Sequence, residues 1–263
     1  MPTAVESVLG LAESMLTQLA SKDVPGRRES LLSSELDTRA ADLIRSLERP
    51  FDAQNPDHLE AARRLWNTAW PNIPCPGLIH GGWTKLGFHS GDLAKELQCG
   101  GISLVHHLLN FATLLPTRYN SAMEIEFPLA PSSLAVCLLV RGFLRLHAPG
   151  TVPQPVGGCG RVASDETLRR FLSWAESRRA RPPPPALPIE CIYPYFCPCH
   201  SDDAFDSLHL EFLVYLLSAW QQTNATLMDL PKALSQTRER IECMLPRIEP
   251  GSSYRIRAEI ADA

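Results

Sequence analysis

Apolar residues recur at intervals of three and four along most of this chain, which is the periodicity of one buried face of an α-helix. The first such stripe runs through 5–19, with apolar side chains at positions 5, 8, 9, 12, 16 and 19. Strand signals are scarce, because Val, Ile and Thr nowhere alternate with polar residues over a useful length. The pattern therefore predicts an all-α fold.

The same spacing predicts further helices, separated by stretches that contain proline and glycine. Asp57 is the expected N-cap of the helix at 57–69, and the helix at 206–222, apolar on most of its sides, is expected to be central. Prolines after position 70 exclude helix there, and 81–101 is expected to be rich in loops. The expected helices cover 28–47, 57–69, 101–115, 132–147 (capped by Ser132 or Ser133), 164–179 (capped by Ser164 or Asp165), 206–222 and 231–245.

Prolines also indicate the limits of the domain. Pro50 ends the helix at 28–47, so residues 1–50 are expected to form an N-terminal helical arm. A single multi-helix domain is then expected over 51–246, with a loop insertion rich in proline and cysteine at about 180–202. The tail, 247–263, is expected to be flexible.

Composition and charge exclude several functions. The 263 residues are 44% hydrophobic and 21% charged, and the net charge of −4 provides no basic field for nucleic acid. The amphipathic start has no basic n-region, so it is not a signal peptide, and the apolar stretch 134–146 is interrupted by Arg141 and Arg145 and is too short to span a bilayer. Eight cysteines without a signal sequence indicate reduced thiols. We therefore expect a cytoplasmic protein with no membrane-spanning segment and no nucleic-acid partner.

No metal or cofactor is expected from the remaining motifs. Cys191, Cys197, Cys199 and His200 carry the ligand types that zinc prefers, but their spacing is irregular and prolines flank them, so they are expected to be free. The adjacent residues at 106–107 are histidines whose side chains point about 100° apart on a helix, with one expected in the core and the other at a polar face. The sequence also lacks a phosphate loop, a G-x-S-x-G elbow and an H-E-x-x-H motif.

Several stretches, in order and with conserved spacing, resemble the ELMO domain. The family pattern includes an entry helix that ends in Leu-Trp-Asn, a Trp-containing loop, a buried helix and a C-terminal helix pair. The matching stretches span roughly 58–245, so the resemblance implies a single all-helical ELMO-type domain following the arm. They are H-L-E-A-A-R-R-L-W-N at 58–67, W-T-K-L-G-F-H-S-G-D at 83–92, the helix at 104–111, F-P-L-A at 127–130, the helix at 213–220 and L-M-D-L-P-K-A-L at 227–234.

The loop at 83–98 is the segment that the resemblance identifies as partner-binding. The family pattern is Trp, three residues, Gly-Phe-Gln, an Asp-Pro and then Thr-Asp-Phe-Arg-Gly. In this chain Leu93 replaces the proline, Glu96-Leu97 stand for Asp-Phe, and Gln98 occupies the position of the arginine. The residues that the resemblance assigns to partner binding are Trp83, Gly87, Phe88, His89, Asp92, Glu96 and Gln98.

Each of these residues also has a purely structural interpretation. Trp83 and Phe88 are large apolar residues of the kind that anchor a loop in the core, and Gly87 suits a turn. Asp92 is a residue type that caps helices. Glu96 and Gln98 are residue types that are commonly solvated.

The substitution at position 98 bears on function. In activating members of the family, the resemblance implies, the arginine acts on an Arf-type GTPase as an arginine finger, which contributes roughly 10³–10⁵ in hydrolysis rate. Gln98 brings no positive charge, so most of that factor should be missing. Lys85 and Lys95 lie nearby in sequence but not at the family position. The resemblance therefore implies a regulator or adaptor that binds a small GTPase of the Arf/Arl type, without a catalytic residue.

Two alternatives stay open. The chain is an activator of atypical chemistry, with a lysine in place of the arginine, or it is a helical scaffold. The family contains members without the arginine that serve as scaffolds for DOCK-type exchange factors, so such an exchange factor is a second expected partner.

Overall fold

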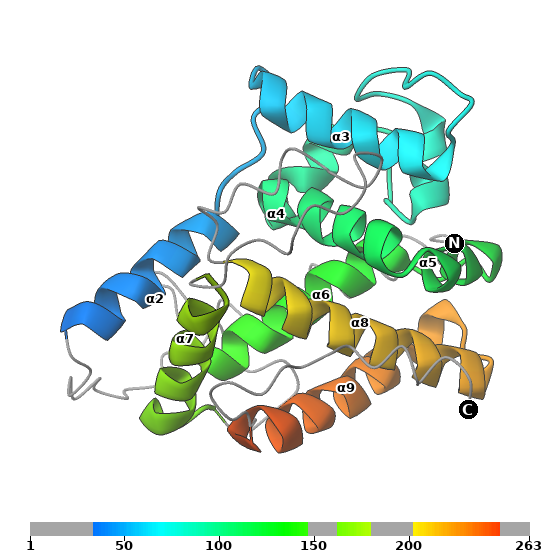
Figure 1. The fold of residues 1–263 in the computed structure, drawn as a ribbon. Coiled ribbons are helices and arrows are strands. Elements are labelled where there is room, and N and C mark those ends of the chain that lie inside the picture. Colours follow the sequence, from blue (N-terminus) through cyan, green and yellow to red (C-terminus); the bar gives the residue numbers. More distant parts are fainter. Residues whose placement is uncertain (1–33, 147–161, 180–201, 248–263) are drawn as a thin grey trace, which may run out of the picture.

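The computed structural model describes residues 34–146, 162–179 and 202–247, and every regular element within them is helical (Figure 1), which confirms the predicted all-α fold. The stripe at 5–19, the proline- and cysteine-rich stretch 180–201 and the tail from 248 lie outside the described residues. None of the described helices is both long enough and apolar enough to cross a membrane. With the labels of Figure 1, the elements are α2 (Ser34–Leu47), α3 (Pro56–Ala69), η1 (Gly81–Leu86), α4 (Leu93–Leu114), α5 (Pro116–Glu124), α6 (Leu129–Leu144), α7 (Asp165–Arg179), α8 (Asp202–Thr223), η3 (Leu227–Asp229), α9 (Leu230–Met244) and η4 (Leu245–Arg247).

Three helices, α4, α6 and α8, pack against one another in the centre of the molecule. The α3 helix covers α4 at one end, and α7 and α9 pack on α8 at the opposite end (Figure 1). The predicted central helix is confirmed, because α8 contacts α4, α6, α7 and α9 and buries residues on several of its sides. This arrangement leaves the connection from α3 to α4 at one corner of the fold (Figure 1).

The α2 helix, which ends the predicted N-terminal arm, packs on the domain. Its apolar stripe, including Leu43 and Leu47, is buried in the common core. Beside this stripe Arg39 pairs with Glu176 of α7 at 2.6 Å. Exposed ion pairs contribute little to stability, so we attribute the docking of α2 mainly to its buried leucine side chains.

The start of α3 differs from the prediction by one residue. Asn55, not Asp57, caps the helix, because its Oδ1 atom accepts a hydrogen bond from the backbone N–H of Asp57 at 2.9 Å. Pro56 occupies the first helical position, where a missing N–H costs nothing. The helix therefore begins at the proline, and its cap moves to the residue before it.

The caps of two later helices give one correction and one confirmation. The α6 helix begins at Leu129, so Ser132 and Ser133, predicted as caps, lie inside it and are fully buried. Ser164 does cap α7, because its Oγ atom accepts a hydrogen bond from the backbone N–H of Thr167 at 3.1 Å. The start at Leu129 was not predicted from the sequence, because this helix lacks a side-chain cap.

The α4 helix begins at Leu93, so the last part of the predicted loop at 81–101 is helical. The helix is broken at Gly101. Gly101 has φ 59° and ψ −162°, a conformation that only glycine adopts at low cost. The backbone N–H of Ile102 leaves the helix and bonds to the carbonyl oxygen of Arg49 at 3.2 Å. The helix thus consists of a first segment, 93–100, and a second segment, 102–114, and its start lies eight residues before the predicted one.

A buried polar cluster joins the central helices. His107 and His209 stack with ring centroids 4.1 Å apart and an interplanar angle of 15°. The Nε2 atom of His107 lies 3.2 Å from a carboxylate oxygen of Asp206, whose other oxygen accepts from Asn110 at 2.9 Å. The Nε2 atom of His209 lies 2.9 Å from the carbonyl oxygen of Ser133. His107 is thus the core member of the histidine pair predicted from the sequence, and its neighbour at 106 is exposed.

Candidate functional site

Buried aromatic rings hold the connection between α3 and α4 from inside. The indole N–H of Trp66 donates to the carbonyl oxygen of Ile73 at 2.9 Å, and that of Trp83 donates to Gly77 at 3.0 Å. The two indoles meet edge to face at 5.1 Å, and Trp83 meets Phe88 in the same way at 6.1 Å. All three rings are buried, so Trp83 and Phe88 support the loop and present no surface to a partner.

The two ends of the loop are joined by a short antiparallel pairing. The backbone N–H of His80 donates to Gly91 at 2.7 Å, and the N–H of Leu93 donates to Leu78 at 2.9 Å. The η1 turn lies between these paired stretches and ends at Gly87 in the left-handed conformation, with φ 83°. The loop is therefore fixed at its base.

Gly87 also meets a close approach of backbone from another helix. A Cβ atom at this position would lie 2.7 Å from the backbone nitrogen of Leu129 at the start of α6. The glycine thus allows η1 to pack directly against α6, in agreement with the turn role expected from the sequence.

Two carboxylates connect the loop to the start of α4. Asp92 caps the helix, because its Oδ1 atom accepts from the backbone N–H of Lys95 at 3.2 Å, in agreement with the cap role expected from its residue type. Glu96 accepts from the backbone N–H groups of His89 at 3.2 Å and Ser90 at 3.0 Å. Both carboxylates therefore hold backbone in place, and Glu96 is half-buried where the sequence suggested a solvated or partner-facing residue.

The 93–100 segment buries one face and exposes the other. Leu93 and Leu97 are fully buried, whereas Lys95, Gln98 and Cys99 are exposed. Lys95 and Gln98 are three residues apart on a helix, so their Cβ atoms are neighbours at about 5–6 Å. Position 98 thus faces solvent beside a lysine, on a helical turn that its buried leucines, its cap and the loop hold in place.

The seven residues predicted for partner binding therefore differ in where their side chains lie. Trp83, Gly87 and Phe88 face the interior, and Asp92 and Glu96 support the backbone. Only His89 and Gln98 are exposed at the surface. Ile79, which is the most exposed large hydrophobic residue among those that the structure describes, was not predicted because an isolated isoleucine in a proline-rich loop has no periodicity.

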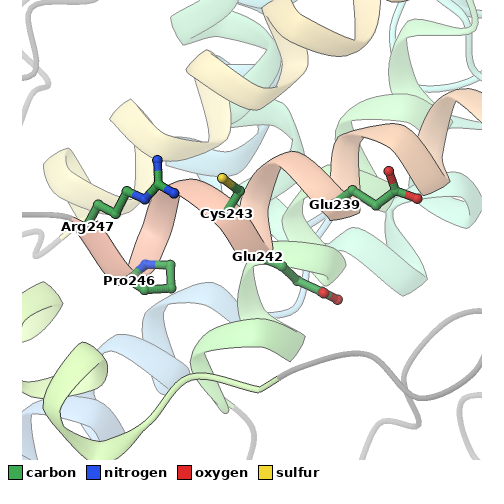
Figure 2. Close-up of a pocket in the computed structure, with 5 residues that line it drawn as sticks. All are labelled: Glu239, Glu242, Cys243, Pro246 and Arg247. Atoms are coloured by element: carbon green, nitrogen blue, oxygen red, sulfur yellow. The ribbon is translucent and has the colours of Figure 1, made fainter.

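A hollow of about 460 Å³ lies at the other end of the molecule, along α9 and η4. Its lining residues are Glu239, Glu242, Cys243, Pro246 and Arg247. Figure 2 shows that these side chains are spread along one helix and do not converge on a common point. This hollow therefore shows no arrangement of an acid, a base or a nucleophile that would indicate catalysis.

Within the described stretches 34–146, 162–179 and 202–247, no cluster of three or more His, Cys, Asp and Glu side chains is arranged to hold a metal ion. Cys191, Cys197, Cys199 and His200 lie outside these stretches, so the structure does not test the prediction made for them.

The sequence profile of the ELMO/CED-12 family matches residues 41–234, which is most of the chain and includes every element of the candidate site. The chain belongs to the ELMO/CED-12 family. The match begins inside α2 and ends inside α9. The finer limits at 51 and 246 stay a prediction.

Individual relatives are distant and longer. ELMO domain-containing protein C of Dictyostelium discoideum is 22% identical over 215 residues, which are 79% of this chain and 29% of that protein. ELMO domain-containing protein 1 is 29% identical in Mus musculus and 31% identical in Pongo abelii, in each case over 72 residues, 27% of this chain and 22% of the relative. The aligned part thus spans less than a third of these curated relatives. No solved structure matches the chain.

Proposed function

We propose that this ELMO domain binds a small GTPase of the Arf/Arl type through the exposed face of the 93–100 segment and does not accelerate GTP hydrolysis. The observation that supports the proposal best is the exposure of Gln98. The family resemblance assigns its position to the arginine of activating members, and the turn that carries it is anchored by Asp92, Glu96 and two buried leucines.

The chemistry of position 98 argues for binding without activation. Hydrolysis of GTP develops negative charge on the phosphoryl oxygens, and a cation placed there stabilises the transition state. The Gln98 amide donates hydrogen bonds but carries no charge. Lys95 carries the charge, but its ammonium lacks the planar fork of a guanidinium, and its backbone lies about one helical turn away.

Replacing Gln98 by arginine should raise the single-turnover rate of GTP hydrolysis about 10- to 100-fold, whereas the wild-type domain should leave the rate unchanged. The gain is smaller than the roughly 10³–10⁵ of a well-placed arginine finger. The reason is that Leu93 and Leu97 replace the proline and phenylalanine of the family pattern, so the support under the side chain differs. The measurement uses a panel of purified Arf and Arl GTPases.

Gln236→Arg is the matched control, because Gln236 is also an exposed glutamine within a helix, but on α9. This control should not change the rate. Strong activation by the wild-type domain would contradict the proposal. Binding is tested separately by measuring which GTPases of the panel the immobilised domain retains. If the domain retains none of them, the alternative of a helical scaffold is favoured. An exchange factor of the DOCK type and a cytoplasmic location remain expectations.

A further inference from the structure

The surface around the start of α4 has an uneven distribution of charge. The stretch 71–100 contains two of the four lysines in the chain, Lys85 and Lys95, and only two carboxylates, Asp92 and Glu96. Both carboxylates accept hydrogen bonds from backbone N–H groups at or beside the helix N-terminus, whose partial positive charge they offset. Both lysines are exposed, and neither forms an ion pair with any part of the chain that the structure describes. The cationic side chains that this stretch exposes to solvent are therefore Lys85 and Lys95, in a protein with a net charge of −4.

An exposed apolar side chain lies next to this charge. Ile79 is 76% exposed, and it forms an isolated antiparallel bridge with Asp92. Since Asp92 in turn caps the backbone N–H of Lys95, the isoleucine lies close to the first turn of α4. The backbone bonds on either side, from His80 to Gly91 and from Leu93 to Leu78, fix the stretch that carries Ile79. Contact with a partner at this point would cost little ordering of the chain.

Resting on the proposed function, we infer that Ile79, Lys95 and Gln98 form a basic–apolar face that docks on an acidic protein surface of the GTPase. The ammonium of Lys95 pairs with an Asp or Glu side chain there, and Ile79 packs on an apolar side chain beside that carboxylate. Complementary charge of this kind speeds encounter and selects the partner. An apolar neighbour 76% exposed to solvent suits a protein surface better than the phosphate groups of a nucleotide.

The test is the equilibrium Kd of the full chain for the GTPase of the panel that binds most tightly, loaded with GDP or with a non-hydrolysable GTP analogue. Lys95→Glu should weaken binding at least tenfold in whichever nucleotide state binds, because it places like charges opposite each other. The wild-type affinity should fall as salt rises, and Lys95→Glu should reduce or reverse that dependence. Ile79→Ala should weaken binding about threefold to tenfold, since it removes part of a buried apolar contact.

Lys232→Glu is the matched control, because Lys232 is an exposed lysine in the first turn of another helix, α9. Its Kd should stay within about twofold of the wild-type value. Unchanged thermal midpoints for Lys95→Glu and Ile79→Ala would show that both variants are folded, as expected for exposed positions.

The outcomes separate this inference from the proposed function. If the wild type binds and Lys95→Glu binds equally well, the inference is wrong while the proposed function stands. The inference is also wrong if Lys95→Glu weakens binding to the GTPase loaded with the GTP analogue but not a measurable binding to the GTPase loaded with GDP. The lysine would then face the phosphate. If the wild-type chain binds no GTPase of the panel, the proposed function fails, and this docking surface fails with it.

Discussion

Replacing Gly101 by alanine should lower the free energy of unfolding by about 2–6 kcal/mol. This value is the sum of two costs of about 1–3 kcal/mol each. One is the cost of an alanine held at positive φ, and the other is the cost of a crowded contact. The added Cβ atom would lie 2.2 Å from the carbonyl oxygen of Arg49. Relief of that contact would break the hydrogen bond from Ile102 to the same oxygen. Urea denaturation followed by circular dichroism measures the change.

Gly142→Ala provides the matched control with the opposite sign. Gly142 lies within α6, and a Cβ atom there would meet nothing within 4 Å. Alanine in a helix interior is favoured over glycine by roughly 0.5–1 kcal/mol, so this variant should be slightly more stable than the wild type. Equal denaturation midpoints for the two variants would show that the break in α4 does not constrain the fold.

Acidification below pH 6.5 should destabilise the domain, with His209 as one cause. Burial holds the pKa of His209 well below 6.5, and the neighbouring ring of His107 lowers it further. The Nε2 atom of His209 carries its proton toward the carbonyl oxygen of Ser133, so a second proton would place a charge in the core against the stacked ring.

The sign of this pH dependence follows from proton uptake. Below pH 6.5 the unfolded chain binds a proton at His209 that the folded chain does not bind, so the free energy of unfolding falls as pH falls. The loss from this residue is at most about 1.4 kcal/mol per pH unit, and it continues until the folded pKa is reached. Burial also lowers the pKa of His58, which acts in the same direction. Glu211 acts in the opposite direction, because burial raises its pKa.

The contribution of His209 is isolated by comparing variants. His209→Gln keeps a donor but cannot titrate, so its free energy of unfolding should fall less steeply between pH 7 and pH 5 than that of the wild type. Equal slopes for this variant and the wild type in urea titrations would show that His209 is not the source. Should His209→Gln fail to fold, calorimetry can measure the proton uptake on unfolding of the wild type. That uptake gives the slope of the wild-type free energy of unfolding against pH.

The sequence predicted most helices because each long stripe of apolar residues faces the core. The prediction failed where the apolar stripe was short, or where the conformation depends on a contact with a residue far away in the sequence. The α5 helix buries only Tyr119 and Ala122, too few to produce a recognisable period. The sequence predicts the start of a helix at Gly101, where the structure has a break inside α4. The break at Gly101 depends on the backbone of Arg49, about fifty residues earlier, and no local pattern records that contact.

The candidate site shows the same division. The cap at Asp92 was predictable, because an N-cap is a local property of a residue type and its position. The inward direction of Trp83 agrees with the core-anchor interpretation of a large apolar residue, whereas the exposure of Ile79 depends on the paired stretches of the loop and required the tertiary structure. The family resemblance located position 98, but its exposure beside Lys95 was known only once the orientation of the first turns of α4 was determined.

The break at Gly101 also has a consequence for amide hydrogen exchange. Because the N–H of Ile102 bonds to Arg49, the hydrogen-bond ladder of α4 is interrupted, and we expect the segments 93–100 and 102–114 to open as separate units. The second segment lies in the core between α6 and α8, whereas the first is held mainly by its cap, by Glu96 and by two leucines. A partner bound at Gln98 would therefore slow deuterium uptake in peptides that end before Gly101 and leave those after it unchanged.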